Sequence, residues 1–384
     1  MKNNILKVLI CYSCGVCSIV CPQKAVFMEC DKKGFLYPKV NNELCTNCGI
    51  CIDNCVGTGR VISDKKPIIC IGCRLKKPEE IKNSSSGGAF VLVADFILQE
   101  QGYIVGAILT DTFEVEHIVT NNRIDRDKMR GSKYLQSDLK DVFIKVKHLL
   151  EIGKVVLFTG LPCQVAAIYK FLPNNLLENF YTIDLLCHGV PSKTVFSDYI
   201  NWLEKKYGRI KKYEFRSRKC GWHGSNVYIQ FQNGMELLDT IEANAFDSLY
   251  SRGFLTKETC YSCEYMSIER IGDFSIGDFW GIEKLEKSDD LKEGCSLVLV
   301  NTQKALKLWN IIKDKTINVE VSLEDCLQPS LYRKLNRNSN INRFNFDYSC
   351  HGFSYVAKRY AHFKALSKLY SMFFKLQSKW ENRK

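Results

Sequence analysis

The sequence predicts an α+β domain followed by an α/β domain with a mixed, partly parallel sheet, flanking helices and a basic C-terminal helix. Three observations predict this class: a dense run of cysteines, an alternation of strand and helix patterns after it, and a basic helical pattern near the end. Strand–helix–strand order with short connections favours a partly parallel sheet with right-handed crossovers. We therefore expect domains at 1–62, 68–330 and 331–384, the middle one having two halves that meet near 155–185.

The composition is that of a globular protein, with 384 residues of which 46% are hydrophobic and 25% are charged. No stretch approaches the roughly 18 uninterrupted apolar residues of a membrane-spanning helix. The short apolar start runs into a cysteine motif without a cleavage site, so we expect a cytoplasmic protein. In a reducing compartment, 19 cysteines indicate metal ligation or catalysis rather than a disulfide framework.

The N-terminal cysteines form the run Cys-x2-Cys-x2-Cys-x3-Cys twice. Three thiolates at every third position let one short loop bind a cubane, and the fourth thiolate reaches the other cluster. We assign one [4Fe–4S] cluster to Cys11, Cys14, Cys17 and Cys55, and a second to Cys21, Cys45, Cys48 and Cys51. The alternative, a pair of zinc knuckles, needs two separated Cys-x2-Cys pairs instead.

Residues 8–60 thus resemble a bacterial-type two-cluster ferredoxin domain. Gly15 and Gly49 each follow the second cysteine of a run, where a missing Cβ lets backbone N–H groups approach the sulfurs. Cys30 fits no position of the motif and is expected to be a buried thiol in a hairpin.

The middle domain alternates helices and strands. A helix is expected at Ala89–Gln101, closed by Gly102. Buried or alternating strands are expected at Tyr103–Leu109, Lys154–Thr159, Tyr181–Cys187, Asn226–Gln232 and Ser296–Val300, the last leading into a helix at Gln303–Lys313. Pro162 and Ser192 each stand where a helix follows a strand. Ligands bind in loops at the carboxyl ends of such strands.

The loop Ser84–Gly88 directly precedes the first of these helices. Free N–H groups and the helix dipole would both face a phosphate there. A flexible linker with a good N-cap explains the loop equally well.

Seven segments together carry a more specific signal. They are SSSGGAF (84–90), KYLQS (133–137), FTGLPCQ (158–164), DLLCHGVPS (184–192), FRSRKCGW (215–222), Cys260-x2-Cys263 and DFSIGDFWG (273–281). In order and spacing they resemble the beta-subunit family of coenzyme F420-reducing hydrogenases and dehydrogenases, from about residue 8 to 345.

The resemblance implies FAD and iron–sulfur clusters as cofactors. The residues that look like the flavin-phosphate loop are Ser85, Ser86, Gly87 and Gly88, with Lys133, Gly160 and Pro162 as further flavin-site candidates. Those that look like ligands of a third [4Fe–4S] cluster are Cys163, Cys187, Cys260 and Cys263. Buried structural thiols, or half a zinc site for the last two, are the alternatives.

Other polar residues and thiols have two readings. His188 is either a structural loop residue or part of a proton relay, and Asp278 and Trp280 either shape the site or pack a turn. Cys70 and Cys73 are either a redox pair or incidental thiols. Cys220, Cys295, Cys326 and Cys350 are interpreted as incidental.

The net charge of +12 is concentrated in the tail: residues 331–384 hold twelve Lys or Arg against two acidic residues. The nearly neutral remainder excludes a nucleic-acid surface there. From Phe353 to Phe374 apolar residues recur at three- and four-residue steps, with Lys364, Lys368, Lys375 and Lys379 on the opposite face. Such a helix would contact a membrane surface or an acidic partner, or pack on the body.

Together these features favour an iron–sulfur flavoprotein oxidoreductase. Electrons would pass between a one-electron carrier of the ferredoxin type and FAD, which exchanges hydride with an organic substrate or a deazaflavin coenzyme. The alternative is a non-catalytic adaptor that transfers electrons to or from a partner oxidoreductase subunit, in a setting such as surface-polysaccharide synthesis. A zinc-stapled interaction protein is a third reading.

Overall fold

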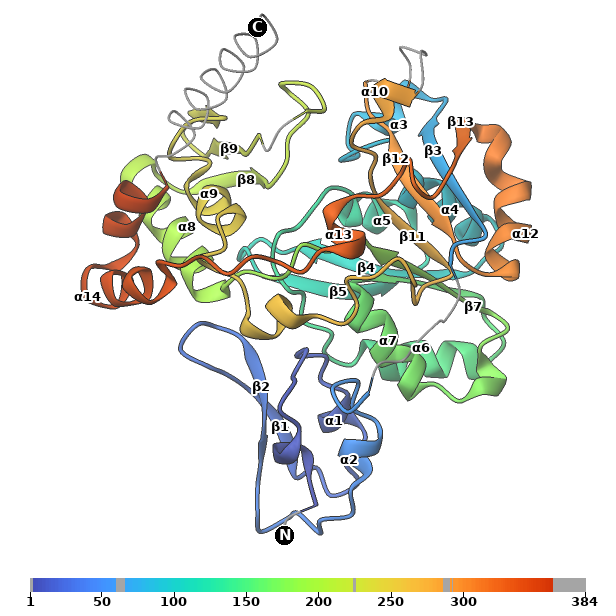
Figure 1. Ribbon diagram of the computed structural model, residues 1–384, viewed down its shortest axis with the longest axis horizontal. Helices are drawn as coiled ribbons and strands as arrows, with labels where there is room; N and C mark the ends of the chain where they lie inside the picture. Colours follow the sequence, from blue (N-terminus) through green and yellow to red (C-terminus); the bar gives the residue numbers. More distant parts are fainter. Residues whose placement is uncertain (1–2, 60–65, 224–225, 286–290, 292, 362–384) are drawn as a thin grey trace, which may run out of the picture. The chain divides into compact units, whose positions relative to one another are not determined.

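The computed structural model describes residues 3–59, 66–223, 226–285, 291 and 293–361 (Figure 1). The chain divides into two units. The first comprises Met1–Val190 and Lys257–Leu335, and the second comprises Pro191–Thr256 and Asn336–Lys384. The first segment of the second unit is thus inserted, in sequence, into the first unit. The domain boundaries expected from the sequence stay predictions.

An eight-stranded sheet forms the centre of the first unit, in the order β13-β3-β12-β11-β7-β6-β4-β5. The strands are β3 (Ile69–Leu75), β4 (Tyr103–Leu109), β5 (Val115–Thr120), β6 (Val156–Gly160), β7 (Phe180–Leu185), β11 (Phe274–Asp278), β12 (Ser296–Val300) and β13 (Thr316–Val321). Strands β4, β6, β7 and β11 run parallel, and the remaining pairings are antiparallel. The predicted mixed, partly parallel sheet is confirmed.

Helices cover both faces of this sheet. One core contains residues of α3 (Pro78–Ile81), α4 (Ala89–Gln99), α5 (Arg123–Met129) and α12 (Gln303–Ile312), and the other contains residues of α6 (Val142–Glu151) and α7 (Pro162–Phe171). Strand β6 serves both cores, because Leu157 packs into the first and Val156 and Phe158 into the second. A strand buried on both faces reads as a continuous apolar run, which is the pattern that the sequence showed.

Some helices and strands begin or end at other residues than predicted. β4 and β12 match their predicted ranges, whereas β7 ends at Leu185, so that Cys187 lies in the following loop. Helix α4 ends before Gly102, and the left-handed residue there is Gln101 with φ 55°. Gly102 is required for a different reason, since a Cβ would press on the carbonyl oxygens of Val155 and Ile97.

Residues 3–59 contain one hairpin and three short helical turns. Strands β1 (Val26–Cys30) and β2 (Leu36–Val40) pair antiparallel, and the turns are η1 (Ile5–Lys7), α1 (Val16–Ile19) and α2 (Ile50–Asp53). Cys30 lies in the hairpin as expected, but it is exposed, so its predicted burial is wrong. The ferredoxin fold of this region stays a prediction.

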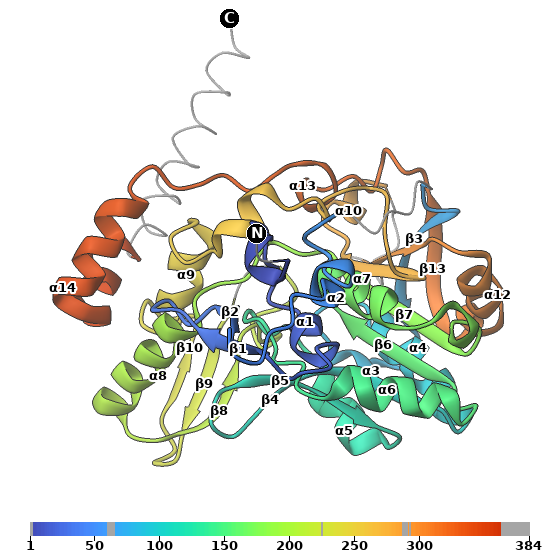
Figure 2. The same ribbon diagram turned by 90° about the horizontal axis from the view of Figure 1, so that it is seen from below.

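The second unit has a three-stranded antiparallel sheet, in the order β10-β9-β8 (Figure 2). Its elements are β8 (Ile210–Glu214), β9 (Tyr228–Phe231), β10 (Glu236–Leu238), α8 (Lys193–Tyr207), α9 (Ala245–Ser251) and α14 (Ile341–Tyr360). Ser192 caps α8 by accepting a hydrogen bond from the Val195 N–H at 3.2 Å, as the sequence predicts. Phe196, Tyr199 and Phe246 form an aromatic core with ring centroids 4.9–6.0 Å apart.

The C-terminal helix begins earlier than predicted, at Ile341, and Gly352 interrupts it with φ 70°. Phe353, Val356 and Tyr360, the first apolar residues of the predicted stripe, are buried within the second unit. The rest of the stripe and the lysines of its polar face lie outside the described residues.

Several short turns complete the described chain. They are η2 (Asn174–Leu176), η3 (Glu258–Ser262), α10 (Ile282–Leu285), η4 (Lys313–Lys315) and α13 (Pro329–Tyr332). Within the described part of the chain, none of the helices has the length and apolarity that crossing a membrane requires.

Candidate functional site

The predicted site residues that follow strands of the large sheet lie at one edge of it. The carboxyl ends of β4, β6, β7 and β11 share this edge, and β3 runs in the same direction as β11, two antiparallel steps away. Ser84–Gly88 follows β3, Gly160 ends β6, and Cys187 follows β7. Loops at such an edge are the usual ligand-binding position in α/β sheets.

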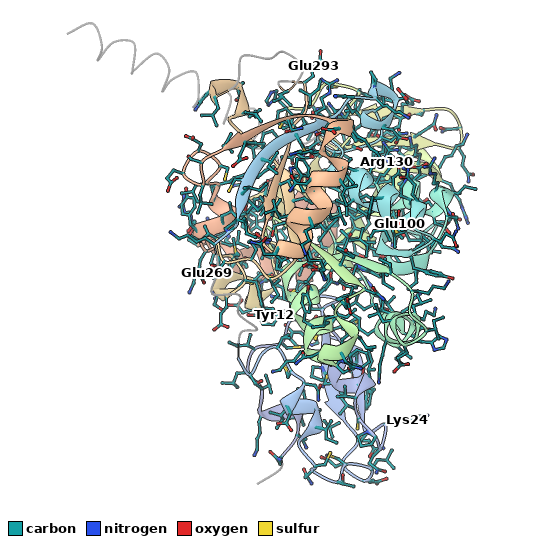
Figure 3. All side chains as sticks on the ribbon, turned by 90° about the vertical axis from the view of Figure 1, so that its right-hand side faces the viewer. Tyr12, Lys24, Glu100, Arg130, Glu269 and Glu293 are labelled. Atoms are coloured by element: carbon teal, nitrogen blue, oxygen red, sulfur yellow. The ribbon has the colours of Figure 1, made fainter. Side chains whose placement is uncertain are left out.

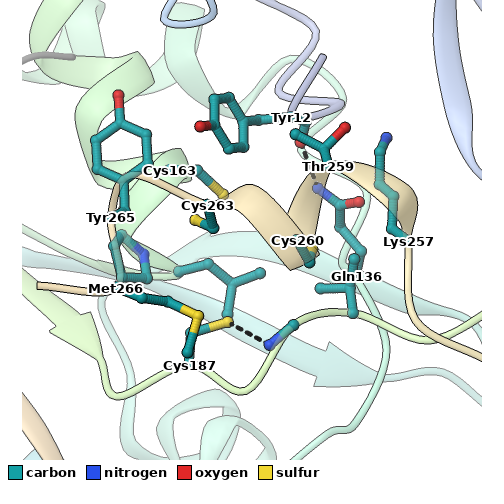
Figure 4. A pocket seen from close by; sticks show the side chains of 14 residues that line it. Tyr12, Gln136, Cys163, Cys187, Lys257, Thr259, Cys260, Cys263, Tyr265 and Met266 are labelled. Carbon is teal, nitrogen blue, oxygen red and sulfur yellow. Dashed lines mark hydrogen bonds between the residues drawn. The ribbon is translucent and has the colours of Figure 1, made fainter. Parts of the chain in front are cut away.

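Four of the predicted metal ligands line one pocket at this edge (Figure 4). Cys163 lies in the first turn of α7, Cys187 follows β7, and Cys260 and Cys263 lie on η3 and directly after it. The hollow measures about 460 Å³, part of which is open solvent. Burial raises the pKa of Cys163 well above its usual value, and the nearby Cys263, Cys187 and Cys260 each raise it further. The fold thus brings together cysteines a hundred residues apart.

The four thiols surround a hollow rather than a point. Among the described residues, no three His, Cys, Asp or Glu side chains form a group that could hold a metal ion. A cubane presents a separate iron atom to each thiolate, so its ligands stand around a space. The arrangement is compatible with a cubane, and the third cluster stays a prediction.

A buried ion pair holds the segment that carries Cys260 and Cys263 against β7. Arg270 is 2% exposed and Asp184 is not exposed at all. Arg270 donates to Asp184 through Nε, at 3.0 Å from Oδ1, and through Nη2, and it also donates to the Leu185 carbonyl at 3.1 Å. The Gly272 N–H donates to Asp184 Oδ2 at 2.7 Å. Since Cys187 lies two residues beyond Leu185, the pair fixes both sides of the pocket.

The two N-terminal cysteine runs have the same backbone geometry. Ser13 and Asn47 both have φ 58°, two residues after the first cysteine of each run. Gly15 (φ 75°) and Gly49 (φ 84°) follow in the left-handed region and start α1 and α2. A positive φ is nearly free of cost only for glycine, which explains its place in both runs. The repeated sequence therefore folds into a repeated loop.

The grouping of these cysteines follows the predicted exchange of fourth ligands. A second hollow is lined by Cys11, Cys14, Cys17 and Cys55, together with eight other residues that include Tyr12. In the other group, Cys21 and Cys48 are close enough to Cys51 to raise its pKa. Cys45 accepts a hydrogen bond from Asn4 Nδ2 at 3.7 Å.

Backbone N–H groups donate to the sulfurs of the predicted ligands. The N–H two residues further on donates to Cys11, Cys55 and Cys187, at 3.4, 3.3 and 3.3 Å. The Ala25 N–H donates to Cys21 at 3.3 Å. Cys295 and Cys326, outside the predicted sites, donate their S–H to carbonyl oxygens at 3.6 and 3.3 Å, and the predicted ligand Cys45 donates to Asn47 Oδ1 at 3.9 Å. Accepting N–H bonds suits a thiolate, and donating suits a neutral thiol.

Burial opposes ionisation of the predicted ligands in the chain alone. It raises the pKa of Cys14 and of Cys187 to about 12, and that of Cys260 to about 11. A bound metal centre deprotonates its thiol ligands through its positive charge. Cluster assembly at these sites would therefore release protons.

The flavin-phosphate loop is accounted for largely by packing. A Cβ on Gly87 would collide with the carbonyl oxygen of Cys73, and one on Gly88 (φ 89°) would meet Leu75. Ser85 Oγ lies 2.9 Å from Ser132 Oγ, and Ser86 Oγ lies 2.7 Å from Ser296 Oγ. The glycines thus permit close packing on β3. The loop fits a phosphate only through backbone N–H groups at the start of α4.

The other flavin candidates differ in how they are placed. Lys133 donates to the carbonyls of Lys128 and Arg130 at 2.9 and 2.8 Å, and desolvation lowers its pKa to about 7. A Cβ on Gly160 would meet the ring of Phe158 at 2.9 Å, whereas Pro162 lines the four-cysteine pocket. Pro162 therefore borders the predicted third cluster.

Cys70 and Cys73 are not a redox pair with each other, because residues three apart on β3 face opposite sides of the sheet. Cys70 instead makes a side-chain hydrogen bond with Cys326. Burial lowers the pKa of His188, and the Asp278 charge opposes this shift. A proton relay through His188 stays a prediction, as does a role for Trp280.

Sequence reasoning missed three residues that shape the site. Tyr12 lines both cysteine hollows, Lys257 lines the pocket beside Cys260, and Gln136 donates to the Tyr12 carbonyl at 2.7 Å. Figure 3 shows Tyr12 where the N-terminal segment meets the helices of the sheet region. The sequence does not show which segments meet in the fold. The position of Tyr12 next to Cys11 was the one signal that could have marked it as a site residue.

Comparison with known proteins finds a family match for the middle and later part of the chain. Residues 153–324 match the family described as the C-terminal region of the beta chain of coenzyme F420 hydrogenase/dehydrogenase. This region of the chain is therefore similar to that family. It includes the four pocket cysteines and Pro162, whereas Ser84–Gly88 and the N-terminal cysteine runs precede it. The family resemblance inferred from the sequence motifs is confirmed.

Two further comparisons give a related sequence and a solved structure. An uncharacterized protein of Methanocaldococcus jannaschii is 28% identical over 210 residues, which are 47% of this chain and 58% of that protein. The match thus spans little more than half of the relative. A chain of the F420-reducing [NiFe] hydrogenase complex of Methanosarcina barkeri has 19% identity and a TM-score of 0.47, covering 71% of this chain and 86% of that one. A likeness of this degree carries no argument about function.

Proposed function

We propose that the chain is an iron–sulfur flavoprotein oxidoreductase that passes electrons between a ferredoxin-like carrier and FAD through three [4Fe–4S] clusters. The observation that carries the proposal is that the fold gathers predicted cluster ligands around two hollows. Cys163, Cys187, Cys260 and Cys263 line one, and Cys11, Cys14, Cys17 and Cys55 line the other. The match of residues 153–324 to the F420 hydrogenase/dehydrogenase family supports a redox role.

The three cysteine groups form a series. Cys48 is exposed and belongs to the outermost group, while Cys17, Cys21, Cys51 and Cys55 share one small core that joins the two N-terminal groups. Tyr12 lines the hollow of Cys11, Cys14, Cys17 and Cys55 and also the four-cysteine pocket. Electrons can therefore move from the surface to the sheet edge in short steps.

The surface around Cys48 suits an electron-carrier protein. Leu44 is 50% exposed and Ile50 is 38% exposed, on either side of the Cys45–Cys48 loop. Exposed apolar residues beside a redox centre favour a transient protein contact. We therefore place the external carrier, or a partner oxidoreductase subunit, at this end.

FAD, when bound, supplies two-electron chemistry that can be divided into single-electron steps. The chain's own part would be to hold its phosphates through backbone N–H groups at the start of α4, with Pro162 and the pocket cysteines at the same edge of the sheet. An organic substrate or a deazaflavin coenzyme would react at the same edge of the sheet. An adaptor without catalysis would carry the clusters but show no turnover and no flavin.

Three serine variants of the anaerobically purified chain test the proposal. Cys14→Ser should remove one electron paramagnetic resonance signal of the dithionite-reduced protein and Cys187→Ser a different one. Cys326→Ser is the matched control, because it removes a buried thiol that donates to the Leu323 carbonyl. If Cys14→Ser and Cys187→Ser both keep every electron paramagnetic resonance signal, the cluster assignment is contradicted. Acid extraction of FAD from the same preparations tests the flavin.

A further inference from the structure

Lys257 places a positive charge inside the first unit, where the N-terminal segment meets the loop of Cys260 and Cys263. The residue is 1% exposed. Its Nζ donates a hydrogen bond to Ser13 Oγ and lies 4.2 Å from the ring centre of Tyr37 and 5.6 Å from that of Phe35. The ammonium is thus solvated by one hydroxyl and two aromatic faces.

Within the described part of the chain, no Asp or Glu oxygen makes an ion pair with the Lys257 ammonium. The Asp31 carboxylate influences it electrostatically without contacting it. Burying an ammonium without a counter-charge costs several kcal/mol. A residue of this kind persists when something else nearby supplies negative charge.

The groups around Lys257 are predicted cluster ligands of two different sites. Cys11 belongs to the N-terminal hollow, and Cys260 and Cys163 belong to the four-cysteine pocket, and all three interact electrostatically with the ammonium. The Ser13 that binds Nζ also donates its N–H to Cys11 at 3.4 Å. As neutral thiols these groups carry no charge, whereas thiolates bound to a cubane give it a net negative charge.

The two sites share a wall beside this charge. Tyr12 lines both hollows and packs its ring edge-on against Tyr265, with centroids 5.3 Å apart. The Thr259 hydroxyl donates to the Cys11 carbonyl at 3.1 Å, so the loop with Cys260 is bonded directly to the backbone of a ligand of the other site. Tyr12 is therefore part of a wall that the two sites share.

We propose that Lys257 is a fixed cation shared by the two cluster sites, which raises the reduction potential of both and makes the Tyr12 wall the electron crossing between them. The inference rests on the proposed function, because it needs a cluster at each site. Reduction adds negative charge to a cubane, and a nearby buried cation stabilises the reduced form more than the oxidised one. Lys257 is a positioning residue, since it acts through the ligands.

A redox titration of the anaerobic full-length protein, monitored by electron paramagnetic resonance, tests this inference. Lys257→Met keeps the length and apolar stem and removes the charge, and Lys257→Gln keeps a hydrogen-bond donor for Ser13. Both variants should retain wild-type iron and shift two midpoint potentials to more negative values. Lys257→Arg should leave both near their wild-type values.

Lys170 provides the matched control. Its Nζ donates to the carbonyl of Cys55 at 2.7 Å, and Cys55 lines the N-terminal hollow but not the four-cysteine pocket. Lys170→Met should therefore shift one midpoint and not the other. If Lys257→Met and Lys257→Gln keep full iron and both midpoint potentials stay unchanged, this inference is overturned, whereas the proposed function is not. Wild-type protein that lacks the four-cysteine cluster would overturn the proposed function and this inference with it.

Discussion

Replacing Arg270 tests how the four-cysteine pocket is held together. In Arg270→Met the carboxylate of Asp184 stays fully buried, and among the described residues it keeps the Gly272 N–H at 2.7 Å as its one charge-stabilising donor. The variant also leaves the carbonyls of Tyr265, Ser267 and Leu185 without the guanidinium bonds they accept.

The size of the effect follows from this burial. Removing one partner of a buried ion pair costs about 3–5 kcal/mol, because an uncompensated charge remains. For a unit of this size, that corresponds to a fall of about 6–10 °C in the thermal unfolding midpoint. Arg270→Met combined with Asp184→Asn should recover part of the loss, since it removes both charges.

The assay is anaerobic thermal unfolding together with the iron content of each purified variant. We expect Arg270→Met to lose about four of the iron atoms, those of one cubane, because the segment bearing Cys260 and Cys263 is released from β7. Lys145→Met is the control, since the Lys145–Asp141 ion pair at 3.1 Å has both side chains more than half exposed and is worth at most about 1 kcal/mol. A midpoint within about 2 °C of wild type and full iron in Arg270→Met would refute the reasoning.

Three further predictions concern other parts of the first unit. Burial holds the pKa of His117 at about 4, so the unfolded chain binds more protons than the folded chain as the pH falls, and the free energy of unfolding should decline by about 1.3 kcal/mol from pH 7.5 to 5.5. His117→Gln should remove this part of the pH dependence in thermal unfolding, and an unchanged pH dependence would contradict the prediction. Gly87→Ala should cost about 1–3 kcal/mol or more because its Cβ meets the Cys73 carbonyl, whereas Gly59→Ala, with open space around it, should stay within about 0.5 kcal/mol in the same measurement. Cys70→Ala and Cys73→Ala should retain all the iron, since neither thiol lines a cysteine hollow. Iron loss in either variant would mean that the cysteines are assigned to the wrong clusters.

Local patterns predicted those features that depend on local interactions. The continuous apolar runs of β4 and β12 marked strands buried on both faces, and Ser192 and Pro162 marked helix starts through capping and a preset φ. The repeated cysteine spacing also predicted two similar loops, which Gly15 and Gly49 form in the same conformation.

Features that depend on distant contacts were beyond the sequence. Nothing in the segment around Lys257 indicates that its ammonium reaches Ser13, 244 positions away. The same holds for Arg270, whose partner Asp184 was visible in a motif but not as an ion pair. The loop Ser84–Gly88 shows the opposite case, in which glycines that suggested a phosphate are required by packing on β3.

The central claim, three [4Fe–4S] clusters on one chain, is tested most directly by counting metal and sulfide. Anaerobically purified protein should contain about twelve iron and twelve acid-labile sulfide per chain, four of each for every cubane. About eight of each would leave the four-cysteine pocket without a cluster. Zinc with no acid-labile sulfide would contradict the account altogether.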